Sequence, residues 1–285
     1  MYRFATLNDI HIGEEHFGIR ETIKEHDDVE PYPARCLRAA VSEAKAWGAQ
    51  RLVVKGDLTD EGTEDQFEWF AAVLNETGVD ADVLLGNHDV RYPDVDGPAV
   101  LRNRGVRVAT ETTAIDVPGL RIILLPSTKE THNAQWKASD RAEALRLAGE
   151  VDTPVFIATH HYPQRFNHPN TLPVGVPRRE SRPFIHDLNR VAPGSIIAAG
   201  HTHRHHRRHF GTLLFTEVGS PKDYPGVWAG YTVYEGGITQ TVRRVEEPSC
   251  REWNDRTGRA VAGIWRVWSP GLRSHRCWTW EWPKR

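Results

Sequence analysis

Residues able to bind a metal cation recur in five short blocks of the chain. The blocks are Asp9-Ile10-His11, Gly56-Asp57, Gly86-Asn87-His88-Asp89, Thr159-His160-His161 and Gly200-His201-Thr202-His203. Their donor atoms are carboxylate and amide oxygens and imidazole nitrogens, without Cys, a set that suits Mn, Fe or Zn. The candidate metal ligands are Asp9, His11, Asp57, Asn87, His160, His201 and His203. They are too many for one tetrahedral ion and indicate two divalent ions, about 3.5–4 Å apart, that share a carboxylate.

Each block follows a segment that we expect to be a β-strand. These strands are predicted at Tyr2–Asn8, Arg51–Lys55, Ala81–Leu85, Pro154–Thr159 and Ser195–Ala199. In open α/β sheets, sites form at the carboxyl ends of strands, so the blocks are expected to converge. Asp9 and His11 should project to one side if the chain there is extended, because alternate residues of a strand share a face. The same holds for His201 and His203.

Apolar periodicity predicts the elements that carry these strands. Helices are expected at Pro33–Trp47 and Thr63–Thr77, the second beginning with a capping box of Thr63 and Gln66. The resulting β-α-β-α-β order indicates a layered α/β fold. Further elements are expected as a hairpin of Ala114–Val117 and Arg121–Leu125, helices Ser139–Ala148 and Arg182–Val191, and strands Thr212–Val218, Gly230–Tyr234 and Ile238–Arg243.

Length and composition exclude several classes of protein. The 285 residues are 39% hydrophobic and 26% charged, which excludes a disordered chain and a coiled coil. No apolar run is long enough to span a bilayer, and no signal peptide precedes the first strand, so we expect a cytoplasmic protein without a membrane partner. A net charge of -2 argues against nucleic acid as a partner held by bulk charge. The sequence leaves open whether the protein forms a homo-oligomer.

The composition changes near residue 246, where a segment rich in Trp and Arg begins. We expect residues 246–285 to be an extension packed on a domain formed by residues 1–245. Trp278, Trp280 and Trp282 alternate, which favours packing of one strand face over a stacking platform for a base. Cys250 and Cys277 are expected to be free thiols rather than a disulfide.

Three features near the blocks have no fixed role from sequence. Residues 162–180 are rich in proline and are expected to be a loop; as a lid, it would present Arg165, His168, Arg178 and Arg179 to the substrate. The basic run Arg204–His209 is expected to be a solvated face. His161 is expected to be a packed or orienting histidine.

The five blocks in this order resemble the motifs of the calcineurin-like metallophosphoesterases, D-x-H, G-D, G-N-H-[DE], H and G-H-x-H. The resemblance covers about residues 1–245. The runs GDLTDEG and HHYP look most similar to bacterial class III cyclic-nucleotide and glycerophosphodiester phosphodiesterases. The resemblance implies a four-layer α/β/β/α sandwich with a dinuclear metal site at one edge. The Trp-rich C-terminal extension lies outside it.

The resemblance also implies which residues bind each metal. The ligands of one ion would be Asp9, His11, Asp57 and His203, and those of the other would be Asp57, Asn87, His160 and His201. A hydroxide bridging the ions would attack phosphorus in line. His88 would donate a proton or hydrogen bond to the leaving oxygen, and Asp60 would orient His88. Purple acid phosphatases place a metal-binding Tyr where Asp60 stands, so we expect no purple Fe(III) centre.

Hydrolysis of small phosphodiesters, such as a cyclic nucleotide or a glycerophosphodiester, is the predicted activity. The partner is then a small anionic phosphate ester, and the cofactors are two divalent ions (Mn, Fe or Zn). A phosphomonoesterase is one alternative. A nuclease of the double-strand-break-processing type is another, although no coiled coil or DNA-binding cap is evident. Every ligand position is filled, which argues against a non-catalytic scaffold.

Overall fold

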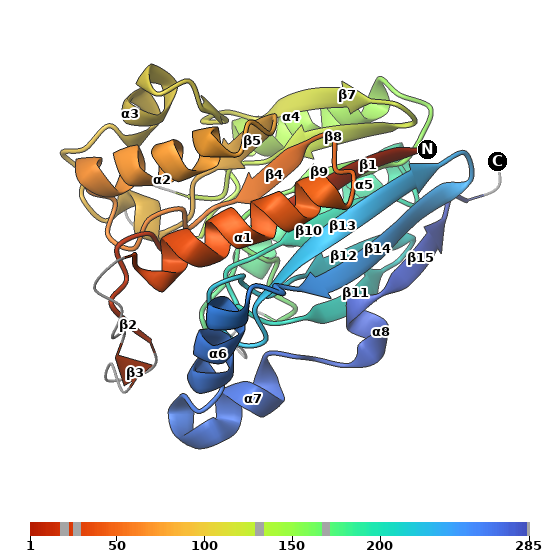
Figure 1. The fold of residues 1–285 in the computed structure, drawn as a ribbon. Helices are drawn as coiled ribbons and strands as arrows, with labels where there is room; N and C mark the ends of the chain where they lie inside the picture. The colour runs from red at the N-terminus through yellow and green to blue at the C-terminus, as the bar shows by residue number, and fades with distance from the viewer. Residues whose placement is uncertain (18–22, 25–29, 129–133, 167–171, 284–285) are drawn as a thin grey trace.

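The protein is described from a computed structural model, which covers residues 1–17, 23–24, 30–128, 134–166 and 172–283. Two β-sheets stack face to face, and helices cover the outer face of each (Figure 1). This is the four-layer α/β/β/α sandwich expected from sequence. No helix in the described ranges is long and apolar enough to cross a membrane.

The first sheet has seven strands in the order β15-β14-β13-β1-β4-β5-β6. Their bounds are β1 Tyr2–Leu7, β4 Leu52–Lys55, β5 Ala81–Leu84, β6 Arg107–Val108, β13 Val227–Tyr234, β14 Gly237–Arg244 and β15 Trp278–Glu281. Strands β1, β4 and β5 are parallel, with Ala5 opposite Leu52 and Leu52 opposite Ala81. Their carboxyl ends therefore meet at one edge.

The second sheet has six strands in the order β11-β12-β10-β9-β8-β7. Their bounds are β7 Thr113–Val117, β8 Leu120–Leu124, β9 Val155–Ala158, β10 Ile196–Ala199, β11 His206–Phe210 and β12 Leu213–Glu217. Strands β8, β9, β10 and β12 are parallel. A separate pair, β2 (His16–Phe17) and β3 (Ile23–Lys24), lies outside both sheets.

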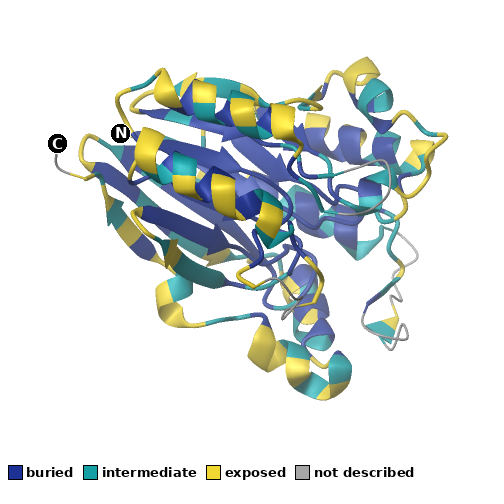
Figure 2. Cartoon of the chain, turned by 180° about the vertical axis from the view of Figure 1, so that it is seen from behind, coloured by how far each residue is buried: buried dark blue, intermediate teal, exposed yellow. Residues whose placement is uncertain are grey.

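Alternation along each strand separates three hydrophobic layers. In β1, Phe4 faces the second sheet and Ala5 faces the helices of the first sheet, as the period of two requires. The central strands are buried on both faces, whereas the helices expose their outer sides (Figure 2). The helices are α1 Tyr32–Ala46 and α2 Glu64–Glu76 on the first sheet, α4 Ala138–Gly149 and α5 Arg178–Val191 on the second, and α3 Gly97–Asn103, which packs against α2.

Several local expectations were wrong. The capping box does not form: Thr63 makes no capping hydrogen bond with its side chain, and Gln66 Oε1 accepts the backbone N–H of Glu61 at 2.9 Å. The basic run is largely the edge strand β11 rather than a solvated face. His205, which belongs to the run and directly precedes β11, is 1% exposed. Arg208 lies over the ring of Phe215 at 4.6 Å.

The expected loop at residues 162–180 is shorter than predicted, because Arg178 and Arg179 already belong to α5. Val176 N–H donates to Tyr162 O at 2.8 Å and ties the two sides of the loop together. His168 lies outside the described residues. Arg165 is exposed.

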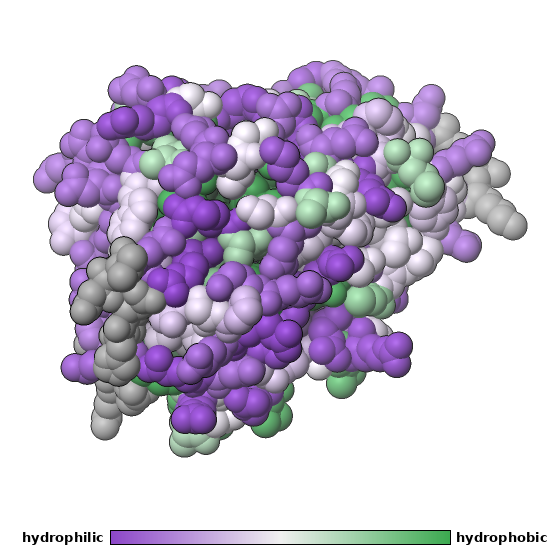
Figure 3. All heavy atoms as spheres, viewed as in Figure 1, coloured by the Kyte–Doolittle hydropathy of each residue, from purple (hydrophilic) through white to green (hydrophobic). Residues whose placement is uncertain are grey.

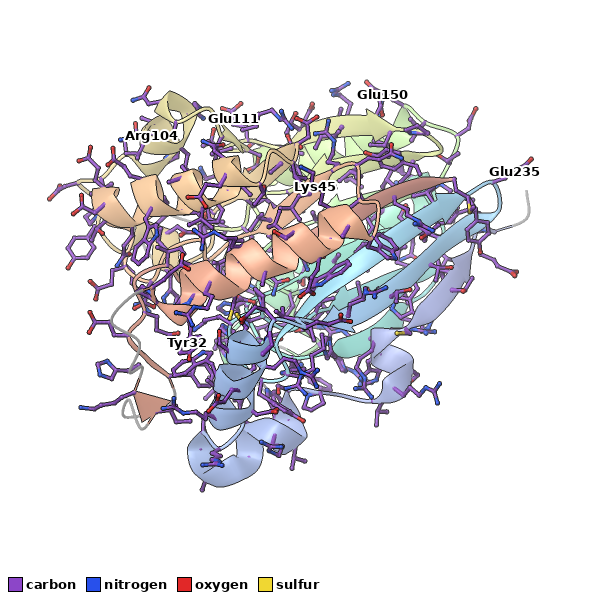
Figure 4. All side chains as sticks on the ribbon, viewed as in Figure 1. Tyr32, Lys45, Arg104, Glu111, Glu150 and Glu235 are labelled. Atoms are coloured by element: carbon purple, nitrogen blue, oxygen red, sulfur yellow. The ribbon has the colours of Figure 1, made fainter. Side chains whose placement is uncertain are left out.

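Residues 246–283 wrap around one end of the sandwich. They form α6 Pro248–Thr257, the 3-10 turn η2 Val261–Gly263, α7 Ile264–Trp268, α8 Arg273–Arg276 and β15. Figure 1 shows this segment passing below the sheets and returning to the free edge of β14. Tyr32, labelled in Figure 4, stacks on Trp253 at a centroid distance of 4.8 Å and joins α1 to α6.

The three alternating tryptophans pack against the hydrophobic layer between the sheets, as expected from sequence. Trp278 is 6% exposed, and Trp280 and Trp282 are partly buried against the same layer. Cys250 and Cys277 are both free thiols. Over the remaining surface in view, hydrophilic residues predominate and hydrophobic ones occur in small groups (Figure 3).

Candidate metal centre

The candidate ligands lie in tight loops just after the parallel strands. Five of them have left-handed backbone conformations, which are uncommon for residues other than Gly. The φ angles are 56° for Asp9, 53° for His11, 50° for Asp57, 70° for His201 and 51° for His203. The loops are therefore not extended, so the reason expected for Asp9 and His11 to lie together was wrong, although both still belong to one cluster with His203. Such strain persists where the surrounding structure enforces it, and it gathers at functional sites.

Asp57 occupies the middle of the cluster. Its Oδ2 lies 3.6 Å from His11 Nε2 and 3.3 Å from His160 Nε2. Its Oδ1 accepts the backbone N–H of His88 at 2.9 Å. One carboxylate thus faces histidines from both sheets, which is the position that a bridging ligand requires.

Asp9 and His203 lie on one side of Asp57. Both Asp9 oxygens accept the backbone N–H of His201 at 3.0 Å, and Asp9 Oδ1 lies 3.7 Å from His203 Nε2. His203 Nδ1 donates to Asp223 Oδ2 at 2.6 Å. Because Asp223 fixes the proton on Nδ1, the Nε2 lone pair of His203 is left for a metal.

Asn87, His160 and His201 lie on the other side. Asn87 Oδ1 is 3.2 Å from His160 Nε2, and His160 Nδ1 donates to the Lys55 carbonyl at 2.7 Å. The His201 ring is 5.1 Å from that of His160. Its Nε2 donates to the Val174 carbonyl at 3.2 Å, which leaves Nδ1 as the ligand atom.

Metal ions fit this donor set. His11 Nε2 is buried and has no hydrogen-bond partner among the described residues, although it faces Asp57. Burial lowers the pKa of His203, but Asp223 and Asp9 outweigh burial and raise that pKa to about 9. Burial also opposes protonation of His160, yet Asp57 raises its pKa to about 9. The cluster thus has a negative field that favours cations.

The geometry also groups the ligands. Four sets of side chains bring possible ligand atoms within 4.8 Å of one another. The sets are Asp9, His11 and His203; Asp9, Asp57 and His160; His11, Asp57 and His88; and His160, His161 and His201. Asp57 belongs to two sets that reach His11 and His160, so the arrangement is compatible with two ions around one carboxylate.

Asp60 and His88 lie beside this cluster. Asp60 Oδ1 is 3.2 Å from His11 Nδ1 and 3.1 Å from His88 Nδ1, and the Asp60 carbonyl accepts from His88 Nδ1 at 2.8 Å. Burial raises the pKa of Asp60, but the hydrogen bonds from His11 and His88 dominate and lower it well below its usual range. Asp60 therefore holds two histidines rather than His88 alone.

Comparison with known proteins identifies the family. Residues 2–205 match the family model described as calcineurin-like phosphoesterase. The chain belongs to the calcineurin-like phosphoesterases. A centre of two metals is typical of this family, and the clustered Asp and His side chains of this chain are candidates to hold one.

Individual relatives are distant. The chain is 29% identical over 175 residues to a probable cyclic nucleotide phosphodiesterase from Rhodococcus erythropolis, a match that covers 59% of this chain and 56% of that protein. A dimetal phosphatase from Danio rerio has a TM-score of 0.65 at 16% identity, over 86% of this chain and 97% of that one. A purple acid phosphatase from yellow lupin has a TM-score of 0.59 at 12% identity, over 86% of this chain and 52% of that one. These structures establish the fold.

Two polar residues of the phosphoesterase site were not found from sequence. Asp223 carries no motif and lies 20 positions from His203, the residue that it orients. Arg91 is only three residues beyond His88, and its Nη2 donates to His88 Nε2 at 2.9 Å. Proximity to the GNHD block was the available signal for Arg91.

His161 keeps the role expected from sequence. Ser127 Oγ accepts its backbone N–H at 3.0 Å and lies 2.9 Å from its Nδ1. Burial and the neighbouring His201 lower its pKa, so the ring is neutral. Its ring centroid is 4.4 Å from that of His201, which makes it a packing neighbour of the metal ligands.

Proposed function

We propose that this phosphoesterase hydrolyses small phosphodiesters of the cyclic-nucleotide or glycerophosphodiester type, with two divalent ions as cofactors. Asp9, His11, Asp57 and His203 would hold one ion. Asp57, Asn87, His160 and His201 would hold the other. The central observation is the Asp57 carboxylate between His11 and His160. The ions would supply Lewis acidity toward the phosphoryl oxygens and would activate the attacking water.

The residues around the cluster fix the ligand atoms in place. Lys55 O and Asp223 hold the Nδ1 protons of His160 and His203, so both Nε2 atoms stay available. Partners of this kind orient metal ligands and raise their basicity. Mn, Fe(II) and Zn suit such an oxygen and imidazole set.

His88 and Arg91 would serve the leaving oxygen. Asp60 accepts the His88 Nδ1 proton, which leaves Nε2 as the atom that can exchange a proton with substrate. Arg91 now donates to that Nε2. His88 could therefore protonate a leaving oxygen only after Arg91 moves aside and Nε2 takes up a proton from water. Arg91 itself offers a charged hydrogen-bond donor at the same place.

The charge of the cleft favours a diester. A cleft of about 450 Å³ lies against the cluster, and none of its described lining residues is Lys or Arg. The buried Lys222 nearby is already paired with Glu14. Apart from the metals, the nearby cations for the second negative charge of a monoester are then Arg91 beside His88 and Arg179 in an adjoining pocket, and neither lines this cleft. The name of the Rhodococcus relative also supports a diester substrate.

Turnover on paired chromogenic esters tests this proposal. The protein is stripped with a chelator, reconstituted with Mn and assayed on bis(p-nitrophenyl) phosphate and p-nitrophenyl phosphate. We expect a higher kcat/KM for the diester, and then activity on cyclic nucleotides or glycerophosphodiesters. A preference for the monoester would make the protein a phosphatase. No turnover of either ester would direct attention to nucleic acid substrates.

A further inference from the structure

The C-terminal extension forms one wall of the metal-centre cleft. The metal-ligand cluster lines one side of this cleft, which has a volume of about 450 Å³. Ala260, Val261 and Trp265 of the extension line it as well, together with Phe17 and Pro173. These residues lie beyond or between the family motifs. Ala260, Val261 and Trp265 also lie beyond residues 2–205, the region that matches the family model.

Trp265 is held in a fixed orientation at this wall. Its Nε1 donates to Asp223 Oδ1 at 3.1 Å, while the other oxygen of Asp223 accepts from His203. Phe17 meets its ring edge to face, at 5.5 Å and 68°. The Trp265 side chain is half-buried, and its centroid is 6.1 Å from that of His203. A rigid indole next to a metal ligand can contact a substrate group without losing further side-chain freedom.

The turn that places Val261 has a strained backbone. Val261 and Ala262 have φ angles of 53° and 54°, followed by Gly263 at 84°. A positive φ is rare for a β-branched residue such as Val, and such strain persists only where neighbouring contacts impose it. Gly263 N–H donates to Arg259 O at 3.0 Å and to Ala260 O at 3.1 Å. The strained turn directs Val261 to the cleft.

The extension also holds the loop that carries Asp223. Trp253 Nε1 donates to Lys222 O at 2.7 Å, and Thr257 Oγ1 accepts from Tyr224 N at 2.8 Å. The charged groups beside the apolar wall already have partners: Lys222, which lies over the Phe17 ring at 5.0 Å, pairs with Glu14, and Asp223 accepts from His203 and Trp265. The wall thus matches an uncharged group.

We propose that the extension forms a subsite for an uncharged aromatic substituent of the phosphoester, such as a nucleobase, with Trp265 and Val261 as its contact residues. This inference rests on the proposed function and narrows its substrate class. A ring that enters the cleft beside the metals would pack on Trp265 and Val261 while its phosphate stays at the cluster. A glycerophosphodiester without an aromatic ring would gain no binding affinity from this wall.

Binding of two phosphonates to the Mn-reconstituted protein tests the subsite without turnover. Phenylphosphonate and methylphosphonate have the same anionic group and cannot be hydrolysed at the P–C bond. By calorimetry, we expect the wild type to bind phenylphosphonate on the order of tenfold more tightly. Trp265→Leu should lose most of that preference and change the affinity for methylphosphonate less than about twofold. The control Trp268→Leu, in the same helix but 37% exposed and outside the cleft lining, should keep it.

Further variants separate this role from support of the metal site. Trp265→Phe keeps a ring but loses the hydrogen bond to Asp223, so it should retain part of the preference. Val261→Gly removes the side chain and the strain, and it should lower the preference with two metals still bound. Equal binding of both phosphonates by the wild type would overturn the proposal. Equal weakening of both in Trp265→Leu would also overturn it, because Trp265 would then act only through Asp223 and His203.

The two proposals fail in different ways. If the phosphonate preference is present but no diester is hydrolysed, the subsite stands and the proposed reaction is wrong. If diesters are hydrolysed without any preference for a ring, the reaction stands and the subsite is wrong.

Discussion

The metal-binding loops and the C-terminal extension meet at one cleft, but they are built by different means. Every candidate ligand lies within four residues of the end of β1, β4, β5, β9 or β10. Regular strand pairing therefore brings them together. The part of the extension that precedes β15 consists of short helices and turns, and it reaches the cleft through side-chain contacts such as Trp265 with Asp223. We expect the first region to carry the chemistry and the second to affect recognition and stability.

The largest effect is expected from Asp57→Ala. Its carboxylate faces ligands on both sides, so its loss should release both ions and reduce hydrolysis of bis(p-nitrophenyl) phosphate to the background rate. Metal content measured by mass spectrometry, together with kcat, checks this. Asp116→Ala, an exposed carboxylate on β7, is the matched control and should retain both. Retention of two ions by Asp57→Ala would contradict the bridging position.

His88→Ala should separate metal binding from proton donation. We expect two bound ions and a fall in kcat of about 10²–10⁴-fold on a diester with a poor leaving group, because general acid catalysis contributes about this much. The loss should be smaller for p-nitrophenolate, which leaves without a proton. Steady-state kinetics on both esters gives the comparison. Full activity on the poor-leaving-group diester would remove His88 from this role.

Trp278→Ala should affect stability but not chemistry. Trp278 is 6% exposed and packs in the hydrophobic layer between the sheets, outside the lining of the cleft. Truncation of a buried Trp costs about 3–5 kcal/mol in the free energy of unfolding. Urea unfolding measures that loss, and the kcat of the folded, metal-loaded variant should stay near wild type. If phosphonate selectivity changed as well, the division of roles within the extension would be wrong.

The smallest effect is expected from Glu247→Gln at the start of α6. Burial opposes ionisation of Glu247, but hydrogen bonds from the Cys250 N–H and from Ser249 prevail and lower its pKa from 4.5 to about 2. The ionised cap thus stabilises the fold above pH 4.5, and this contribution is lost as the pH falls toward 2. Because the carboxylate is partly exposed, screening keeps the effect below about 1 kcal/mol.

Urea unfolding at several pH values measures this contribution. The wild type should be more stable than Glu247→Gln at pH 7, and the difference should narrow as the pH is lowered from about 4.5 toward 3. Comparison of the two proteins at each pH cancels effects common to both. A difference that stays constant down to pH 3 would show that the charge of Glu247 is not its source.

The sequence predicted most strands and helices within a few residues, because apolar periodicity is a local property. It missed α3 and β6, which are short, and the edge strand β11, whose basic residues resemble a surface loop. The buried Glu217 explains β11, since it pairs with Arg204 and His206. The sequence around the basic run contains no pattern that predicts pairing with Glu217.

For the site, the sequence by itself determined the types of the candidate ligands, their spacing and their place after successive strands, and so the family. Tertiary structure alone decided that Asp223 orients His203, that Arg91 lies on His88 and that Trp265 lines the cleft. The physical reason is the range of the interactions. Strand-end loops are specified by neighbouring residues, whereas these contacts form only when separate segments pack together.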